Sequence, residues 1–305
     1  MSDIQEGCFK VVEVGPRDGL QNERQQIPTS TKVHLIEALA NCGLPTVEAT
    51  SFVSPEWIPQ LADAEEVFRA VNKREGTRYP VLVPNLKGFE RAQSVGVDEI
   101  AVFGAASEAF SHKNINCSIA ESLERFRPVI ERATEAGIDV RGYVSCVMGC
   151  PYQGKVSPDD VLRVTRALLE AGCYEVSLGD TIGAGTAGQA RDLIRHLKKE
   201  VPVEKLAVHF HDTRGQAIAN ILVCIDEGIR VADASIAGLG GCPYAPASSG
   251  NVATEELVFM VESLGLKTGV DLPHLIDIGR FISDTLDRPN GSKLGRAGLP
   301  KHYSR

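Results

Sequence analysis

The 305-residue sequence has no hydrophobic run long enough to span a membrane and no excess of basic residues. Its 32 lysines and arginines are outnumbered by 40 acidic residues, which leaves a formal net charge of −8. A membrane partner and a broad nucleic-acid surface are therefore not expected, although a local basic patch for one phosphorylated ligand is compatible with this charge. No basic and apolar leader opens the sequence, so we expect a cytoplasmic protein.

The sequence also lacks a C-x-x-C pair, although it contains eight cysteines. They are scattered along a long chain, which predicts reduced thiols rather than a disulfide framework. Cys146 and Cys150 come nearest to a metal-binding pair. Because no second pair would complete a tetrahedral site, we interpret both as small buried apolar side chains.

What the sequence does contain is a repeated pattern of helix, glycine and strand. A helix that ends in glycine and is followed at once by a strand is typical of short helix-to-strand loops. The helix of residues 29–42 shows one apolar face, and another helix begins with Ser157 as its cap and Pro158 in its first turn. The glycines that end such stretches are Gly43, Gly96, Gly137, Gly172 and Gly228.

Eight strands are predicted from this pattern, at intervals that leave room for a helix after each one. Near-continuous apolar strands are typical of a parallel sheet covered on both faces. We therefore predict a (β/α)₈ TIM barrel that occupies residues 1–305 as one domain, with a short helical extension and a flexible tail at residues 287–305. An open doubly wound sheet is the alternative. The expected strands are residues 10–14, 46–49, 81–83, 100–103, 140–144, 175–178, 207–210 and 232–236.

Polar residues gather where these strands end, which is where TIM barrels build their active sites. A glycine-rich loop follows the eighth expected strand. The polar residues that end or follow the other strands are Arg17, Asp18, Glu48, Asp180, His209 and His211.

His209 and His211 lie two residues apart, so a strand places both imidazoles on one face, where they could share a metal ion. The alternative is a hydrogen-bonded pair of histidines. Asp212, next in the chain, would either orient the imidazoles or begin the next loop. Asp18 is either a turn residue or a third ligand, because the barrel mouth brings it towards the histidines.

Arg17 would place a fixed positive charge beside such a metal, where negative charge develops on a substrate oxygen. Its alternative role is an ion pair, for which Glu48 is the expected partner. Asn251 is best explained by its spacing as a helix cap. As a ligand, it would complete a set of carboxylate, imidazole and amide donors that suits Mg²⁺ or Mn²⁺, with zinc as an alternative.

The segment Gly238-Leu-Gly-Gly-Cys-Pro-Tyr-Ala245 is a glycine-rich loop that carries a thiol. Its spacing differs from a dinucleotide-binding G-x-G-x-x-G, and a mobile lid fits it better. Cys242 could then donate a proton when the lid closes. A structural loop with an incidental cysteine is the simpler explanation.

Several longer strings are together specific enough to indicate a family. The chain resembles 3-hydroxy-3-methylglutaryl-CoA lyases from about Val11 to about Leu286. The matching strings cover residues 14–23, 47–55, 114–118, 141–146, 177–183 and 238–245.

The resemblance implies a metal-dependent barrel, commonly a dimer, that cleaves 3-hydroxy-3-methylglutaryl-CoA to acetyl-CoA and acetoacetate in leucine breakdown and ketone-body formation. It implies a divalent cation, Mg²⁺ or Mn²⁺, and an acyl-CoA substrate. The residues that match the family's metal ligands are Asp18, His209, His211 and Asn251. Those that match catalytic positions are Arg17, Glu48, Asp180 and Cys242, with His209 as a second candidate for proton transfer.

The substrate leaves alternatives open. Arg17, Arg24 and Asn114 are candidates for binding it, although an ordinary surface residue is the simpler interpretation of Arg24 and of Asn114. A substrate with a longer 3-alkyl group, a related barrel synthase that condenses acetyl-CoA, and a non-catalytic barrel are the alternative functions.

Overall fold

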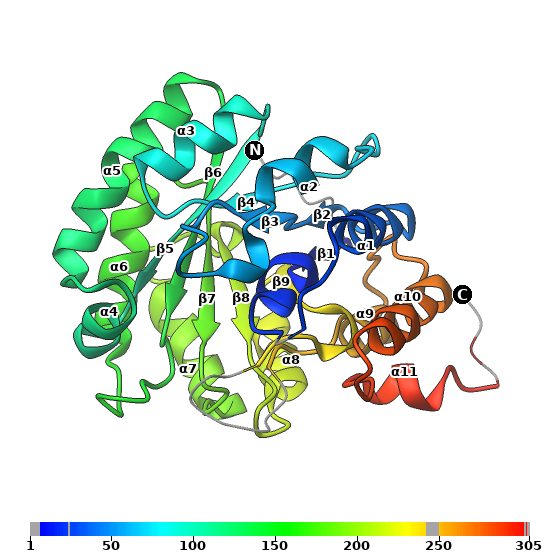
Figure 1. Cartoon of the computed structure of the whole chain (residues 1–305). Coiled ribbons are helices and arrows are strands. Elements are labelled where there is room, and N and C mark those ends of the chain that lie inside the picture. The colour runs from blue at the N-terminus through cyan, green and yellow to red at the C-terminus, as the bar shows by residue number, and fades with distance from the viewer. Residues whose placement is uncertain (1–6, 24, 242–249, 302, 304–305) are drawn as a thin grey trace.

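The computed structural model describes residues 7–23, 25–241, 250–301 and 303. In these residues, parallel strands form one curled sheet with helices around its outside (Figure 1). The strands are β1 (Lys10–Glu13), β2 (Thr46–Val47), β3 (Thr50–Ser51), β4 (Val81–Leu82), β5 (Glu99–Ala105), β6 (Asp139–Ser145), β7 (Glu175–Asp180), β8 (Leu206–Phe210) and β9 (Val231–Ala234).

The second expected strand is divided into two pieces, β2 and β3, and this is where the barrel closes. β2 pairs with β1, whereas β3 pairs with β4. The Glu48 N–H donates to the Glu13 carbonyl at 2.8 Å, and the Ala49 N–H donates to the Pro80 carbonyl at 2.9 Å. The chain thus changes its pairing partner at Glu48. The predicted barrel is confirmed, with one of its eight strands interrupted.

The helices follow the strands in the expected alternation, and a helical C-terminal portion is confirmed. α10 packs against α1 and α9, which puts the orange helix α10 beside the blue helix α1 (Figure 1). The helices are α1 (Thr29–Asn41), α2 (Ala64–Ala70), α3 (Leu86–Ser94), α4 (Glu108–Ile115), α5 (Ile119–Glu135), α6 (Pro158–Ala171), α7 (Ala187–Leu197), α8 (Ala217–Asp226), α9 (Thr254–Ser263), α10 (Leu272–Thr285) and α11 (Lys293–Ala297). Shorter turns are η1 (Gly15–Gly19), η2 (Pro59–Leu61), η3 (Val203–Lys205) and η4 (Ile236–Gly238).

The predicted helix-end signals are confirmed, both the glycines after the C-terminal ends of helices and the serine cap at the N-terminal end of α6. All five glycines expected to follow a helix have positive φ, from 71° to 122°, a conformation that glycine adopts without a steric penalty. The Ser157 hydroxyl accepts the Asp159 N–H at 3.2 Å, ahead of Pro158 in the first turn of α6. These local signals set the lengths of the βα units.

The large apolar core lies between the strands and the helices, while the barrel interior is partly ionic. Arg141 on β6 donates to Asp233 on β9 at 2.7 Å, and both are buried. β7 and β8 separate these two strands in the sheet, so the ion pair crosses the barrel interior. Arg141 also donates to Glu175 at 2.8 Å, and Lys10 reaches the same carboxylate at 3.0 Å.

The segment expected to form a flexible tail, residues 287–305, includes α11. The Gly291 N–H donates to the Ala237 carbonyl at 3.0 Å, and Ser292 is fully buried. The structure thus places the start of this segment against η4, at the carboxyl end of the barrel.

The seven described cysteines are free thiols, which confirms the prediction for them, and Cys146 and Cys150 are buried as expected. In the described part of the chain, no helix has both the length and the apolar character needed to cross a membrane.

Candidate metal and active site

The barrel mouth brings together three of the predicted metal ligands. Asp18 lies in η1, directly after β1, whereas His209 is the penultimate residue of β8 and His211 follows that strand. One ligand atom from each of the three residues lies within 4.8 Å of the others. Among the described residues, these three form a group that could hold a metal ion.

Local backbone structure accounts for this convergence. The N–H groups of Asp18 and Gly19 both donate to the Val14 carbonyl, at 2.7 and 3.1 Å, which bends the chain back directly after β1. On β8, the two-residue strand period puts both imidazoles on one face, with ring centroids 5.6 Å apart. The H-x-H spacing therefore has the geometric consequence predicted from it.

Asn251 joins this group, and the helix-cap interpretation is wrong. It lies two residues before Ala253, which is the cap residue of α9 and makes no side-chain capping hydrogen bond in the described structure. An antiparallel bridge pairs Asn251 with His211, and the Asn251 amide donates to the Asp18 carboxylate at 2.7 Å. Backbone pairing of residues 250–252 with the end of β8 thus carries Asn251 to the histidines.

The available donor atoms fit a divalent cation. Asn251 Oδ1 and His211 Nδ1 are buried, and neither has a hydrogen-bond partner in the described residues. Buried polar atoms are rarely left unpaired, so these two point to a ligand. One carboxylate, two imidazoles and an amide oxygen form a sulfur-free set that suits Mg²⁺ or Mn²⁺.

Arg17 lies beside this donor set and contacts two carboxylates. Its Nε donates to Glu48 at 2.7 Å, which confirms the expected ion pair, and its Nη1 donates to Asp18 at 2.7 Å. The guanidinium also lies 5.7 Å from the ring centre of Tyr143. Arg17 is only 7% exposed, so these contacts hold a largely desolvated cation next to Asp18.

A supporting network on the other side of His209 was missed in the sequence. Asp233 lies opposite His209 in the β8–β9 register and accepts a hydrogen bond from its Nδ1, at 3.1 Å. Ser177 and Arg141 donate to the same carboxylate, at 2.8 and 2.7 Å. This arrangement leaves His209 Nε2 directed towards Asp18, at 3.9 Å from its Oδ2. The signal available in the sequence was a charged residue inside each of two apolar strands, Arg141 in β6 and Asp233 in β9.

Electrostatics keep the Asp18 carboxylate ionised and the His211 imidazole neutral, which are the forms that bind a cation. Burial raises the pKa of Asp18, but the charges of Arg17 and the two imidazoles outweigh burial and hold this pKa at about 2. Burial, together with the neighbouring His209, lowers the pKa of His211 to about 4. Burial also acts to lower the pKa of His209, but the hydrogen bond and charge of Asp233 raise it overall.

Other predicted site residues have different surroundings. The Asp180 carboxylate accepts the N–H groups of Ala184 and Gly185, at 3.2 and 2.8 Å, and burial raises its pKa. It therefore fixes the loop after β7, and the His211 N–H donates to its backbone carbonyl at 3.4 Å. Asn114 is exposed on α4, and no described contact joins it to the Asp18 group. Arg24 and Cys242 lie outside the described residues.

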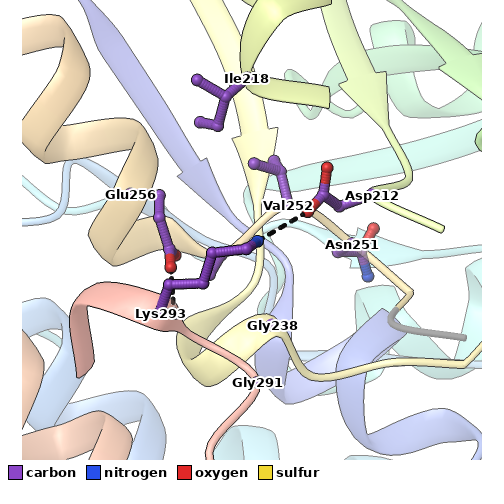
Figure 2. A pocket seen from close by; sticks show the side chains of 9 residues that line it. Asp212, Ile218, Gly238, Asn251, Val252, Glu256, Gly291 and Lys293 are labelled. Atoms are coloured by element: carbon purple, nitrogen blue, oxygen red, sulfur yellow. Dashed lines mark hydrogen bonds and ion pairs between the residues drawn. The ribbon is translucent and has the colours of Figure 1, made fainter. Parts of the chain in front are cut away.

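A pocket beside Asn251 shows how the C-terminal segment meets the site (Figure 2). Lys293 extends across it, with its Nζ 3.3 Å from Asp212 Oδ2, and its backbone N–H donates to Glu256 (Figure 2). Asp212 Oδ1 accepts the Ala217 N–H at 3.0 Å. Asp212 therefore anchors the start of α8 and the C-terminal segment, while Asp233 contacts the imidazole of His209.

Comparisons with known proteins agree with this site. The family model described as HMGL-like matches residues 8–282. The chain is 58% identical over 288 residues to "Hydroxymethylglutaryl-CoA lyase, mitochondrial" of Gallus gallus, which covers 94% of this chain and 97% of that protein. It resembles the crystal structure of hydroxymethylglutaryl-CoA lyase from Pseudomonas aeruginosa with a TM-score of 0.94, 55% identity and coverage of 95% and 97%. It also resembles an HMG-CoA lyase from Acinetobacter baumannii in complex with coenzyme A and 3-methylmalate, with a TM-score of 0.92, 36% identity and 98% coverage of each chain. The chain belongs to the HMGL-like family.

Proposed function

We propose that this chain is a divalent-metal-dependent carbon–carbon lyase that cleaves 3-hydroxy-3-methylglutaryl-CoA to acetyl-CoA and acetoacetate. The observation that carries the proposal is the donor set at the barrel mouth, where Asp18, His209 and His211 meet and Asn251 Oδ1 has no hydrogen-bond partner among the described residues. Relatives at more than 50% identity are named for this lyase, which supports cleavage over the related condensation.

Asp18, His209, His211 and Asn251 would hold Mg²⁺ or Mn²⁺. When bound, the ion would supply Lewis acidity that lowers the pKa of the substrate's tertiary hydroxyl group and would fix the orientation of the substrate. Asp233 keeps His209 in the tautomer whose Nε2 can act as a ligand. The low pKa of His211 keeps its imidazole neutral at physiological pH.

In the reaction, the hydroxyl proton leaves, the C–O bond becomes the ketone of acetoacetate, and the adjacent C–C bond breaks. Its electron pair passes to acetyl-CoA as an enolate, which takes up a proton on carbon. Arg17 would stabilise the enolate oxygen, because its cation is held by Glu48 and shielded from water. Cys242 would return the proton to carbon, with His209 as the second candidate.

The base that removes the hydroxyl proton stays a choice among Asp18, His209 and water. The Asp18 carboxylate is a weak base at neutral pH, because its pKa lies at about 2 and both its oxygens accept hydrogen bonds. This argues against Asp18 as the base. Glu48 and Asp180 would act by holding Arg17 and the loop after β7, respectively.

Three further expectations stay predictions: cytoplasmic location, a homodimer, and roles for Arg24 and Asn114 in binding the acyl-CoA substrate. The Gallus gallus relative is named mitochondrial, so the compartment has to be determined by fractionation of the native cell. Light scattering would determine the oligomeric state.

Metal removal tests the proposed function. Chelation should abolish cleavage of 3-hydroxy-3-methylglutaryl-CoA, and added Mg²⁺ or Mn²⁺ should restore it. His211→Ala should bind Mn²⁺ weakly, whereas His274→Ala, which changes an exposed histidine on α10, should behave as wild type. Full activity in a rigorously metal-free sample would contradict the proposal. A panel of 3-hydroxy-3-alkylglutaryl-CoA esters would determine the accepted alkyl group.

A further inference from the structure

Glu13, the last residue of β1, is fully buried and binds three separate segments of the chain. Its Oε1 accepts the N–H groups of Gly15, at 2.7 Å, and Ile236, at 2.9 Å. Its Oε2 accepts the Thr254 hydroxyl at 2.6 Å. Among the described residues, no lysine, arginine or histidine forms an ion pair with this carboxylate.

Each of the three segments leads to a part of the barrel mouth. Gly15 opens η1, which carries Arg17 and Asp18. Ile236 opens η4, which leads into the glycine-rich loop, and Thr254 opens α9, three residues after Asn251. One carboxyl group therefore joins the segments that bring Asp18 and Asn251 together.

The fit around this carboxyl group is close. A Cβ atom at residue 15 would lie 2.6 Å from Glu13 Oε1, so the group occupies space that only a glycine leaves. Cys42 and Glu255 are titratable groups that interact with Glu13, and neither supplies a positive charge. Burial raises the pKa of Glu13 to about 7. A buried acid without a counter-charge costs stability, and an apolar side chain would avoid that cost.

We propose that Glu13 is a positioning residue for the metal site, which it serves by holding η1, η4 and the start of α9 on one carboxyl group. The contact that it maintains is the 2.7 Å hydrogen bond between the Asn251 amide and Asp18. Protonated and ionised Glu13 can both accept the two backbone N–H groups on Oε1, so the link does not require a charge. This inference rests on the proposed metal-dependent function.

The test measures Mn²⁺ affinity of the chelator-treated, full-length protein by calorimetry, together with kcat and KM after metal is restored. Glu13→Gln keeps an acceptor oxygen and should bind Mn²⁺ within about 3-fold of wild type. Glu13→Met removes both acceptors and should weaken binding by about 10-fold or more and lower kcat. Glu99→Met is the matched control, because Glu99 is equally buried but lies at the amino end of β5.

A purely structural role would lower the stability of Glu13→Met and Glu99→Met alike and leave the Mn²⁺ affinity of the folded proteins unchanged. That result would overturn the proposal. If Glu13→Met does not fold, the Mn²⁺ affinity of Thr254→Val tests the proposal instead. Its control is Thr165→Val, which changes a buried threonine on α6. Thr254→Val should weaken Mn²⁺ binding by about 3-fold or more, and an unchanged affinity would overturn the proposal. Failure of the wild-type protein to bind Mn²⁺ would instead refute the metal-dependent function itself.

Discussion

Arg17 is shared between two carboxylates with different surroundings. Glu48 is fully buried, and burial raises its pKa despite the ion pair with Arg17. Asp18 is partly exposed at the mouth, and its pKa is held low. Glu48 therefore holds the guanidinium from its buried side. Asp18 accepts a hydrogen bond from the same guanidinium and is itself one of the metal donors.

Arg17→Gln should separate charge stabilisation from substrate binding. If Arg17 acts on the enolate only in the transition state, the variant should lose about 10²-fold or more in kcat with little change in KM. Steady-state kinetics with saturating Mn²⁺ measure this, with Arg132→Gln on the surface of α5 as the control. An effect confined to KM would assign Arg17 to substrate binding.

Single residues were predictable where the local pattern has only one geometric outcome. The H-x-H spacing on a strand allows only a shared face for His209 and His211. Asn251 could not be placed from its spacing, because its position depends on backbone pairing with His211, 40 residues earlier in the chain. Asp233 was missed for the same reason, since its role depends on the cross-strand register with His209.

At the level of elements, the site depends on how closely η1 approaches the segment after β9. A Cβ atom at residue 19 would lie 2.7 Å from Ser235 Oγ and 2.8 Å from Leu239 Cβ. Gly19 has no positive φ, so the close approach rather than backbone conformation requires a glycine. The short turn η1, which carries Asp18, thus packs directly against the residues at both ends of η4.

Gly19→Ala should push η1 away from η4. We expect a loss of roughly 1–3 kcal/mol in the free energy of unfolding, as for other insertions into packed regions, and weaker Mn²⁺ binding. Gly188→Ala in α7 is the control, because a Cβ atom there would meet no described atom within 4 Å. Chemical denaturation and calorimetry measure both effects. Wild-type affinity in Gly19→Ala would show that the site tolerates this displacement.

The order of helices and strands was predictable because each βα unit carries its own periodicity and its own end signals. The break between β2 and β3 was not, since it arises where the strand changes its pairing partner from β1 to β4. Glu48 lies at this break. Its sequence position at a strand end therefore indicated the site correctly, while the strand itself was predicted as continuous.

Across the whole molecule, the closed barrel followed from the alternation of units, but its ionic interior did not. Apolar strand sequences predict an interior of branched aliphatic side chains. Arg141, Glu175 and Asp233 instead occupy it, and their mutual contacts depend on the closure of the sheet. Such contacts between distant strands are set by tertiary structure, which no local window of sequence contains.

Buried carboxyl groups should make the stability of the metal-free protein depend on pH. The pKa of Glu13 is about 7 in the folded protein and about 4.5 in the unfolded chain. The stability that its protonated form contributes is therefore full below pH 4.5 and is lost as the pH rises through 7. A shift of this size corresponds to roughly 3 kcal/mol.

Glu13→Gln removes this dependence. The free energy of unfolding of wild type minus that of the variant should fall by up to roughly 3 kcal/mol between pH 4.5 and pH 8. Denaturant titrations of both chelator-treated proteins across this range measure the difference. Parallel stability curves would mean that Glu13 titrates normally in the folded protein.

The charged side chains inside the barrel also affect the register in which neighbouring strands pair. If a strand shifts by two residues, the same side chains still face the interior. An interior made only of aliphatic side chains would therefore favour the native register only weakly over the shifted one. Here such a slip of β7 would carry Glu175 roughly 7 Å away from Arg141 and Lys10. The guanidinium would then remain in the interior with one carboxylate fewer, at a cost of several kcal/mol. We expect this penalty to favour the native register over its neighbours during folding.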